Sequence, residues 1–188
     1  TEPRLYHSTA LLLPDARVLV SGGGRFGPDF PSAEIYSPPY LFQGPRPTIT
    51  SAPGVIPYAG HFTVQTPNAA SIAKVSLLRT GSVTHAFDEN ARFVPLSFTQ
   101  AGAGALDVVA PASGNIAPPG YYMLFLVNGN GVPSVATMVR LPAPSEDATP
   151  PSAPSGLNAT TAPGRVDLTW TAATDNVGVT GYNIHRGT

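Results

Sequence analysis

The stretch His61-Phe62-Thr63-Val64-Gln65-Thr66 decides the fold class, because its side chains alternate strictly between polar and apolar types. Successive side chains of a β-strand point to opposite faces, so Phe62 and Val64 are expected to face a core. On both sides of it, short runs of Val, Ile, Leu, Thr and aromatic residues recur between clusters of Pro, Gly, Asn and Asp, which is typical of strands joined by turns. No long stretch has the helical spacing of apolar side chains without a Pro or Gly inside it. The sequence therefore predicts an all-β protein.

Composition excludes several classes of protein. The chain has 188 residues, with 19 glycines and 22 prolines, and a formal net charge of −1. Hydrophobic residues make up 42% of it, so we expect a buried core rather than a disordered polar chain. The basic residues are scattered singly, which predicts no nucleic-acid partner, and no apolar run is long enough to span a membrane. The absence of cysteine excludes disulfides, thiolate nucleophiles and cysteine-based metal sites.

Changes in composition divide the chain into segments. Residues 1–43 predict three strands and a glycine run, a unit too small to bury its own faces, and we interpret it as part of one β-propeller blade. Residues 44–142 have the strand density of an immunoglobulin-like β-sandwich. Residues 143–154 form a proline-rich linker, and residues 155–188 alternate as further strands. We expect the chain to be a piece of a longer protein.

The expected strands follow from these runs. In the first segment they are His7–Leu13, Arg17–Ser21 and Ala33–Tyr36, with a tight turn at residues 14–16. In the second segment they are Thr48–Ser51, His61–Thr66, Lys74–Arg79, Thr84–Phe87, Phe93–Thr99, Ala105–Val109, Tyr121–Asn128 and Val135–Leu141. Beyond the linker they are Gly156–Thr160, Val166–Trp170 and Gly181–Arg186.

Several blocks, in the same order, resemble the C-terminal part of galactose oxidase and glyoxal oxidase, the copper radical oxidase family. They are RLYHST (4–9), SGGG (21–24), AEIYSPPYL (33–41), RPTI (46–49), LLRTGSVTH (77–85), and PGYYMLF (119–125) running to GVPS (131–134). The resemblance covers residues 4–141. It implies a last kelch-type propeller blade followed by a galactose-oxidase-like Early set (E-set) immunoglobulin-like domain. The tail from Ala153, with Trp170 and Tyr182, resembles the start of a truncated fibronectin type III domain.

The resemblance implies a copper site shared between the blade and the sandwich. Tyr6 matches the axial tyrosinate, which is also the catalytic proton acceptor. His7 matches one equatorial imidazole, and His85, from the sandwich, matches the second. Nitrogen and oxygen donors of this kind suit Cu(II). The family also carries a radical on a tyrosine cross-linked to a cysteine, and because this chain has no cysteine, that half of the site is expected upstream.

The residues themselves set a condition on this site. Adjacent residues of a strand point to opposite faces, so Tyr6 and His7 can share one metal only if the backbone bends before the strand. The run Arg4–His7 contains neither Gly nor Pro and does not predict such a bend. Among the other candidate motifs, Gly22-Gly23-Gly24 lacks the helix and Lys of a phosphate loop and is interpreted as a blade turn. Asp88-Glu89 is interpreted as a polar turn, and His61 and His185 are given no role.

The resemblance implies that the parent protein is a secreted copper radical oxidase. It would oxidise a primary alcohol or an aldehyde, on carbohydrate or a small molecule, with O2 to give H2O2. The fragment alone is expected to be inactive, with the upstream propeller blades as its structural partners. Its basic residues are all Arg except Lys74, which favours a bacterial source. The alternatives are a non-catalytic kelch and E-set protein that binds carbohydrate or a surface, and a structural array of wall-associated modules. Retention of Tyr6, His7 and His85 favours the oxidase.

Overall fold

The computed structural model describes residues 2–24, 27–84, 87–143, 151–175, 179 and 181–185. Their regular structure consists of β-strands and of short 3-10 turns at Pro39–Phe42 (η1) and Ala69–Ser71 (η2), which confirms the all-β prediction. In this part of the chain no helix has the length and hydrophobicity needed to cross a membrane. The chain divides into two compact units, residues 1–144 and 145–188, which are described separately.

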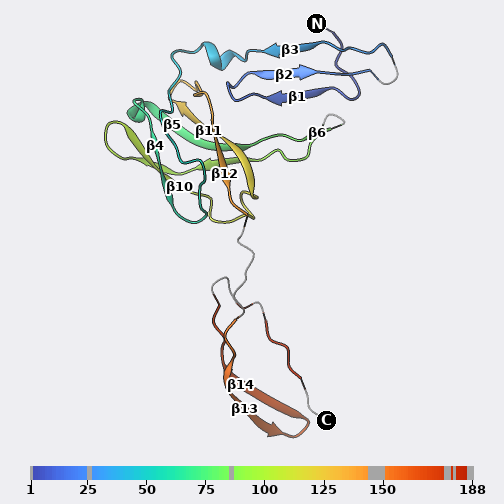
Figure 1. Ribbon diagram of the computed structural model, residues 1–188, viewed down its shortest axis with the longest axis vertical. Coiled ribbons are helices and arrows are strands. Elements are labelled where there is room, and N and C mark those ends of the chain that lie inside the picture. Colours follow the sequence, from blue (N-terminus) through green and yellow to red (C-terminus); the bar gives the residue numbers. More distant parts are fainter. Residues whose placement is uncertain are drawn as a thin grey trace. The chain divides into compact units, whose positions relative to one another are not determined.

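The first unit begins with an antiparallel sheet of β1 (Thr9–Leu12), β2 (Val18–Ser21) and β3 (Ala33–Tyr36), in the order β1-β2-β3 (Figure 1). The predicted tight turn joins β1 to β2, and Leu13 N–H donates to the Arg17 carbonyl across it at 2.8 Å. The Asp15 carboxylate accepts from Arg17 N–H at 3.0 Å and from Arg17 Nε at 2.7 Å. Burial raises the pKa of Asp15, but the hydrogen bonds and charge of Arg17 outweigh it and hold that pKa below its usual value. The turn is therefore fixed by its own side chains.

The rest of this unit is a β-sandwich of two antiparallel sheets. One sheet has the order β4 (His61–Gln65), β10 (Ala105–Val109), β9 (Phe98–Gln100). The other has the order β12 (Thr137–Leu141), β11 (Gly120–Asn128), β5 (Ile72–Arg79), β8 (Phe93–Leu96). Phe62 and Val64 of β4 are 6% and 0% exposed and belong to the core of the sandwich, as their alternation predicted. The immunoglobulin-like prediction is confirmed.

Strand β11 is buried on both faces. Tyr122, Leu124 and Leu126 belong to the core of the sandwich. Met123 and Phe125, which point the other way, form a second buried cluster with Ala16 from the turn between β1 and β2. This explains why the sequence of β11 is a continuous apolar run and does not alternate between polar and apolar residues.

Backbone and side-chain hydrogen bonds reinforce the contact between the β1–β2 turn and the sandwich. The Tyr40 hydroxyl donates to the Ala16 carbonyl at 2.7 Å, and Ala136 N–H donates to the Pro14 carbonyl at 2.8 Å. Burial of the Tyr40 ring raises the pKa of its phenol. The N-terminal sheet, β1 to β3, is thus tied to the sandwich through its first turn, while the residues of β3 are exposed.

Some expected strands differ from the observed ones. Thr48–Ser51 forms no strand, and Ser51 makes only an isolated bridge with Gln65. Phe93–Thr99 is divided at Ser97, because β8 pairs with β5 while β9 pairs with β10 in the opposite sheet. The single strand expected at Thr84–Phe87 is wrong, since Val83–Thr84 (β6) and Phe87–Asp88 (β7) are two strands that pair with each other.

The described residues of the second unit form one hairpin and a segment without regular structure. Strands β13 (Ser155–Ala162) and β14 (Arg165–Thr171) pair antiparallel. The rings of Trp170 and Tyr182 meet edge to face at 5.2 Å, and Ala173 N–H donates to the Tyr182 hydroxyl at 2.7 Å. Residues 181–185 form no strand, and Arg186, the end of the expected strand there, lies outside the described residues. The fibronectin type III identity stays a prediction.

Candidate metal centre

The Tyr6–His7 pair lies on a tight turn immediately before β1. Ser8 N–H donates to the Leu5 carbonyl at 3.0 Å, which closes the turn around the two residues. His7 has a φ of 65°, in the left-handed region that residues other than glycine rarely adopt. The backbone bend that a shared metal requires is therefore present, although the run Arg4–His7 did not predict it.

The turn brings the two candidate side chains together instead of sending them to opposite faces. The ring centroids of Tyr6 and His7 are 4.2 Å apart, and the rings are nearly perpendicular, at 88°. Both residues are exposed. A phenol oxygen and an imidazole nitrogen are donors of the types that Cu(II) prefers, so these two residues fit a copper ion chemically.

The hairpin formed by β6 and β7, called the β6–β7 hairpin below, brings the sandwich to the N-terminal sheet. Strand β6 contacts β1, and Figure 1 shows it directly below that strand. At its base, Gly81 lies so close to the N-terminal sheet that a Cβ there would be 2.8 Å from Leu11 Cδ1. His85, the third predicted ligand, lies between β6 and β7 in the sequence and outside the described residues. Its place beside Tyr6 and His7 stays a prediction.

Asp88 organises the base of the β6–β7 hairpin. Its Oδ1 accepts from the backbone N–H groups of Ser82 and Asn90, at 2.9 and 3.1 Å. Glu89 N–H donates to the Ser82 carbonyl at 3.2 Å. The Asp88 carboxylate is thus engaged in holding the turn, in agreement with its interpretation as a polar turn rather than half of an acid–base pair.

The other titratable groups that the structure describes form no metal site. Among the described residues, no group of three or more His, Cys, Asp or Glu could hold a metal ion. His61 lies on β4, away from the turn, and its Nδ1 is 2.7 Å from Asp107 Oδ2 on the neighbouring strand. The copper ligands predicted from the resemblance, Tyr6, His7 and His85, thus stay a prediction, and only the first two lie within the described residues.

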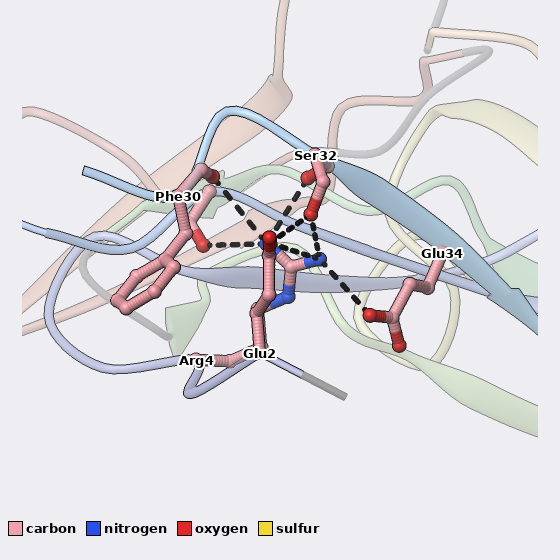
Figure 2. A network of polar contacts seen from close by, with 6 residues as sticks. Glu2, Arg4, Phe30, Ser32 and Glu34 are labelled. Atoms are coloured by element: carbon pink, nitrogen blue, oxygen red, sulfur yellow. Dashed lines mark hydrogen bonds and ion pairs between the residues drawn. The ribbon is translucent and has the colours of Figure 1, made fainter. Parts of the chain in front are cut away.

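One residue next to the turn, Arg4, was not among the predicted site residues. The Arg4 side chain is only 12% exposed and hydrogen-bonds to the segment that follows the glycine run (Figure 2). A signal was available, because only 11% of the residues are charged, and one of these few charges stands two positions before Tyr6.

A family model described as "Galactose oxidase-like, Early set domain" matches residues 46–141, just over half of the chain. The chain belongs to this family. It is 39% identical over 147 residues to galactose oxidase from Gibberella zeae, covering 73% of this chain and 21% of that protein. It is 40% identical over 161 residues to aldehyde oxidase GLOX from Vitis pseudoreticulata, covering 75% of this chain and 30% of that one. These fungal and plant relatives give no support to the expected bacterial source.

A solved structure agrees with the family assignment. A fungal alcohol oxidase of the AA5 family, in complex with copper, superimposes with a TM-score of 0.69 at 32% identity. The match covers 76% of this chain and 32% of that one. The galactose-oxidase-like chain thus spans about a fifth to a third of the length of these relatives. The resemblance to galactose oxidase and glyoxal oxidase is confirmed.

Proposed function

We propose that this chain is the C-terminal part of a secreted copper radical oxidase that oxidises a primary alcohol or an aldehyde with O2. The observation that carries the proposal is the Tyr6–His7 turn, in which a phenol and an imidazole meet with ring centroids 4.2 Å apart. The contact of β6 with β1 supports it, because it brings the strand before His85 to the sheet that begins just after this turn. The similarity to a copper-containing alcohol oxidase supports the choice of metal.

The domain division belongs to the same proposal. Residues 1–43 are the last kelch-type blade of a propeller whose other blades lie upstream, and residues 44–142 are the E-set domain. Residues 143–154 are a linker, and residues 155–188 begin a fibronectin type III domain. A secreted enzyme that acts on carbohydrate or on a small aldehyde would use such a module as a spacer.

Each candidate ligand has its own role in this proposal. His7 and His85 supply neutral imidazole nitrogens, and Tyr6 supplies its phenol oxygen. Bound copper, with a Tyr–Cys radical from the upstream half, would supply two one-electron oxidations. A primary alcohol then loses two electrons and two protons to O2, which gives an aldehyde and H2O2. Tyr6 Oη is the atom that accepts the hydroxyl proton of the alcohol.

The test of the metal site uses the gene that encodes this chain, expressed in full. We expect one equivalent of copper per molecule, and we expect His85→Ala to weaken binding strongly. The matched control is His61→Ala, which removes an exposed histidine on β4 that faces Asp107 and should leave copper binding unchanged. If His85→Ala binds copper like the wild type, the ligand assignment is wrong.

The test of the activity is separate from the test of the metal. Copper-loaded full-length protein should release H2O2 when supplied with primary alcohols or aldehydes and O2. Copper binding without H2O2 from any of these substrates would favour a non-catalytic binding protein. Absence of copper binding would favour a structural module array.

A further inference from the structure

We infer that Arg4 and the glycine run Gly22-Gly23-Gly24 are positioning residues that fix the turn presenting Tyr6 and His7. The inference rests on the proposed function of that turn, and it assigns a task to a motif that the sequence analysis interpreted only as a blade turn. Neither Arg4 nor the glycines would touch the metal or the substrate, so their effect would pass through the backbone of the turn.

The Arg4 guanidinium binds two segments that follow β2. Its Nη1 donates to the carbonyls of Gly22 at 3.1 Å, Ser32 at 3.0 Å and Phe30 at 3.4 Å, as Figure 2 shows in part. Its Nη2 donates to Ser32 Oγ at 2.8 Å. A guanidinium presents these donors in a planar, rigid fork, which the flexible ammonium of lysine does not reproduce. Arg4 therefore connects the residues just before the turn to the glycine run.

Two carboxylates balance the partly buried charge of Arg4. Nη2 lies 3.6 Å from Glu34 Oε1 and 3.8 Å from Glu2 Oε2, and Ser32 Oγ also donates to the Glu2 carboxylate. Figure 2 shows both acidic side chains beside the guanidinium. A charged side chain that is only 12% exposed needs such partners, so the network is built around Arg4 rather than formed by chance on an open surface.

The glycine run contacts the turn so closely that side chains would not fit. A Cβ on Gly22 would lie 2.9 Å from the His7 carbonyl oxygen, and one on Gly23 would lie 3.2 Å from Leu5 N. Both glycines have positive φ values, 76° and 110°, which favour residues without a Cβ. Glycine is therefore required at these positions, because the backbone has positive φ and because it lies so close to the turn.

The glycine run also binds the turn directly. Gly24 N–H donates to the Tyr6 carbonyl at 3.1 Å, and Gly22 packs against the His7 carbonyl. The two residues proposed as ligands are thus held at their backbone by neighbouring glycines, and Arg4 holds the Gly22 carbonyl. Groups that orient a ligand side chain typically affect metal affinity about 10- to 100-fold when they are removed.

The experiment compares Arg4→Lys and Gly22→Ala with two matched controls in the full-length protein. Arg17→Lys changes an arginine whose guanidinium pairs with Asp15 in the β1–β2 turn. Gly102→Ala places a Cβ on a glycine with a φ of 79° but with no atom within 4 Å of that Cβ. The first control shows whether replacing any arginine by lysine has the same effect. The second shows whether a Cβ at a residue with positive φ has the same effect when it meets no neighbouring segment.

We expect both test variants to weaken copper binding about 10-fold or more and to alter the copper electron paramagnetic resonance spectrum, with both controls unchanged. In the copper-free protein, hydrogen exchange of the peptides containing Ser8 and Gly24 should become about fivefold faster, because hydrogen bonds of the turn are weakened. Unchanged exchange and unchanged copper binding in Arg4→Lys would overturn the inference, even if Gly22→Ala fails to fold. Should the wild type bind no copper, the proposed function fails, while exchange in the copper-free protein still decides the role of Arg4.

Discussion

At the scale of single residues, the backbone of His7 is the feature on which the candidate site depends. Its φ of 65° turns the chain between Leu5 and Ser8, so that the Tyr6 and His7 rings meet. Left-handed conformations of non-glycine residues are costly and persist where the surroundings hold them. Here the surroundings are the glycine run, which contacts the carbonyls of both ligand candidates.

Two substitutions at position 7 distinguish the effect of its backbone conformation on stability from the effect of its imidazole on copper binding. His7→Gly should keep the free energy of unfolding within about 0.5 kcal/mol of the wild type, because glycine adopts positive φ readily. His7→Val should lower it by about 1 to 2 kcal/mol, because a β-branched side chain is disfavoured there. Both should lose copper affinity alike, since both lack the imidazole. Urea denaturation and copper titration measure the two effects, and equal stability of the variants would contradict a left-handed His7.

The residue scale also shows what sequence reasoning could find and what it could not. Tyr6 and His7 were identified because their block resembles a known family. The bend between them could not be predicted, because the glycines that accommodate it are separated from it in the sequence by the whole of β1 and β2. The partners of Arg4 at Phe30 and Ser32 could not be predicted either, because they are 26 and 28 positions away in the sequence.

At the scale of elements, the β6–β7 hairpin depends on one carboxylate. The prediction is that Asp88→Ala loosens the hairpin, with hydrogen exchange of residues 80–92 about fivefold faster, because the Ser82 and Asn90 amides lose their acceptor. The free energy of unfolding should change by less than about 1 kcal/mol, because Asp88 is exposed and outside the core. Glu89→Ala is the control, and it should leave exchange unchanged. Equal exchange in the two variants would show that Asp88 does not hold the hairpin.

Strand prediction succeeded where a single face decides burial and failed where polar contacts decide the path of the chain. The alternation of β4 placed Phe62 and Val64 in the core correctly. The run around Thr84–Phe87 has strand-forming residues but folds as two short paired strands. The Asp88 carboxylate accepts a hydrogen bond from Ser82 N–H at the base of these two strands. Strand propensities of single residues cannot predict that contact.

At the scale of the whole first unit, β11 links the N-terminal sheet to the sandwich. We expect Phe125→Ala to lower the free energy of unfolding by about 3 to 5 kcal/mol, because Phe125 is 3% exposed and fills the cluster between the β1–β2 turn and β11. Phe93→Ala, at a ring that is 63% exposed, should cost less than about 1 kcal/mol. Denaturant unfolding of both variants measures the difference. Similar losses for the two rings would mean that the cluster contributes little to stability.

Three phenols make the unit sensitive to alkali. Burial raises the pKa of Tyr40, Tyr58 and Tyr122, and each hydroxyl donates to a backbone carbonyl at 2.7 Å. The unfolded chain ionises at the ordinary tyrosine pKa of about 10, while the folded chain keeps these protons. Stability is therefore complete below about pH 10 and falls as the pH rises above it through the raised pKa values.

The prediction is that Tyr122→Phe makes this decrease in the free energy of unfolding shallower. Tyr121→Phe, at a neighbouring ring that is 59% exposed, should leave the slope as it is in the wild type. Unfolding by urea at a series of pH values around and above 10 gives the slopes. A decrease that is the same in both variants would mean that the buried phenol does not determine the alkaline limit.

Because β11 is buried on both faces, the sandwich depends on the segment that precedes it in the chain. Met123 and Phe125 pack in part against residues that precede the sandwich, among them Ala16 of the β1–β2 turn and Tyr40 of η1. A recombination event that moved the sandwich into another gene would leave this apolar pair facing solvent unless the new neighbour supplied an equivalent cover. We therefore expect this sandwich to occur in other proteins together with the sheet that precedes it, rather than alone.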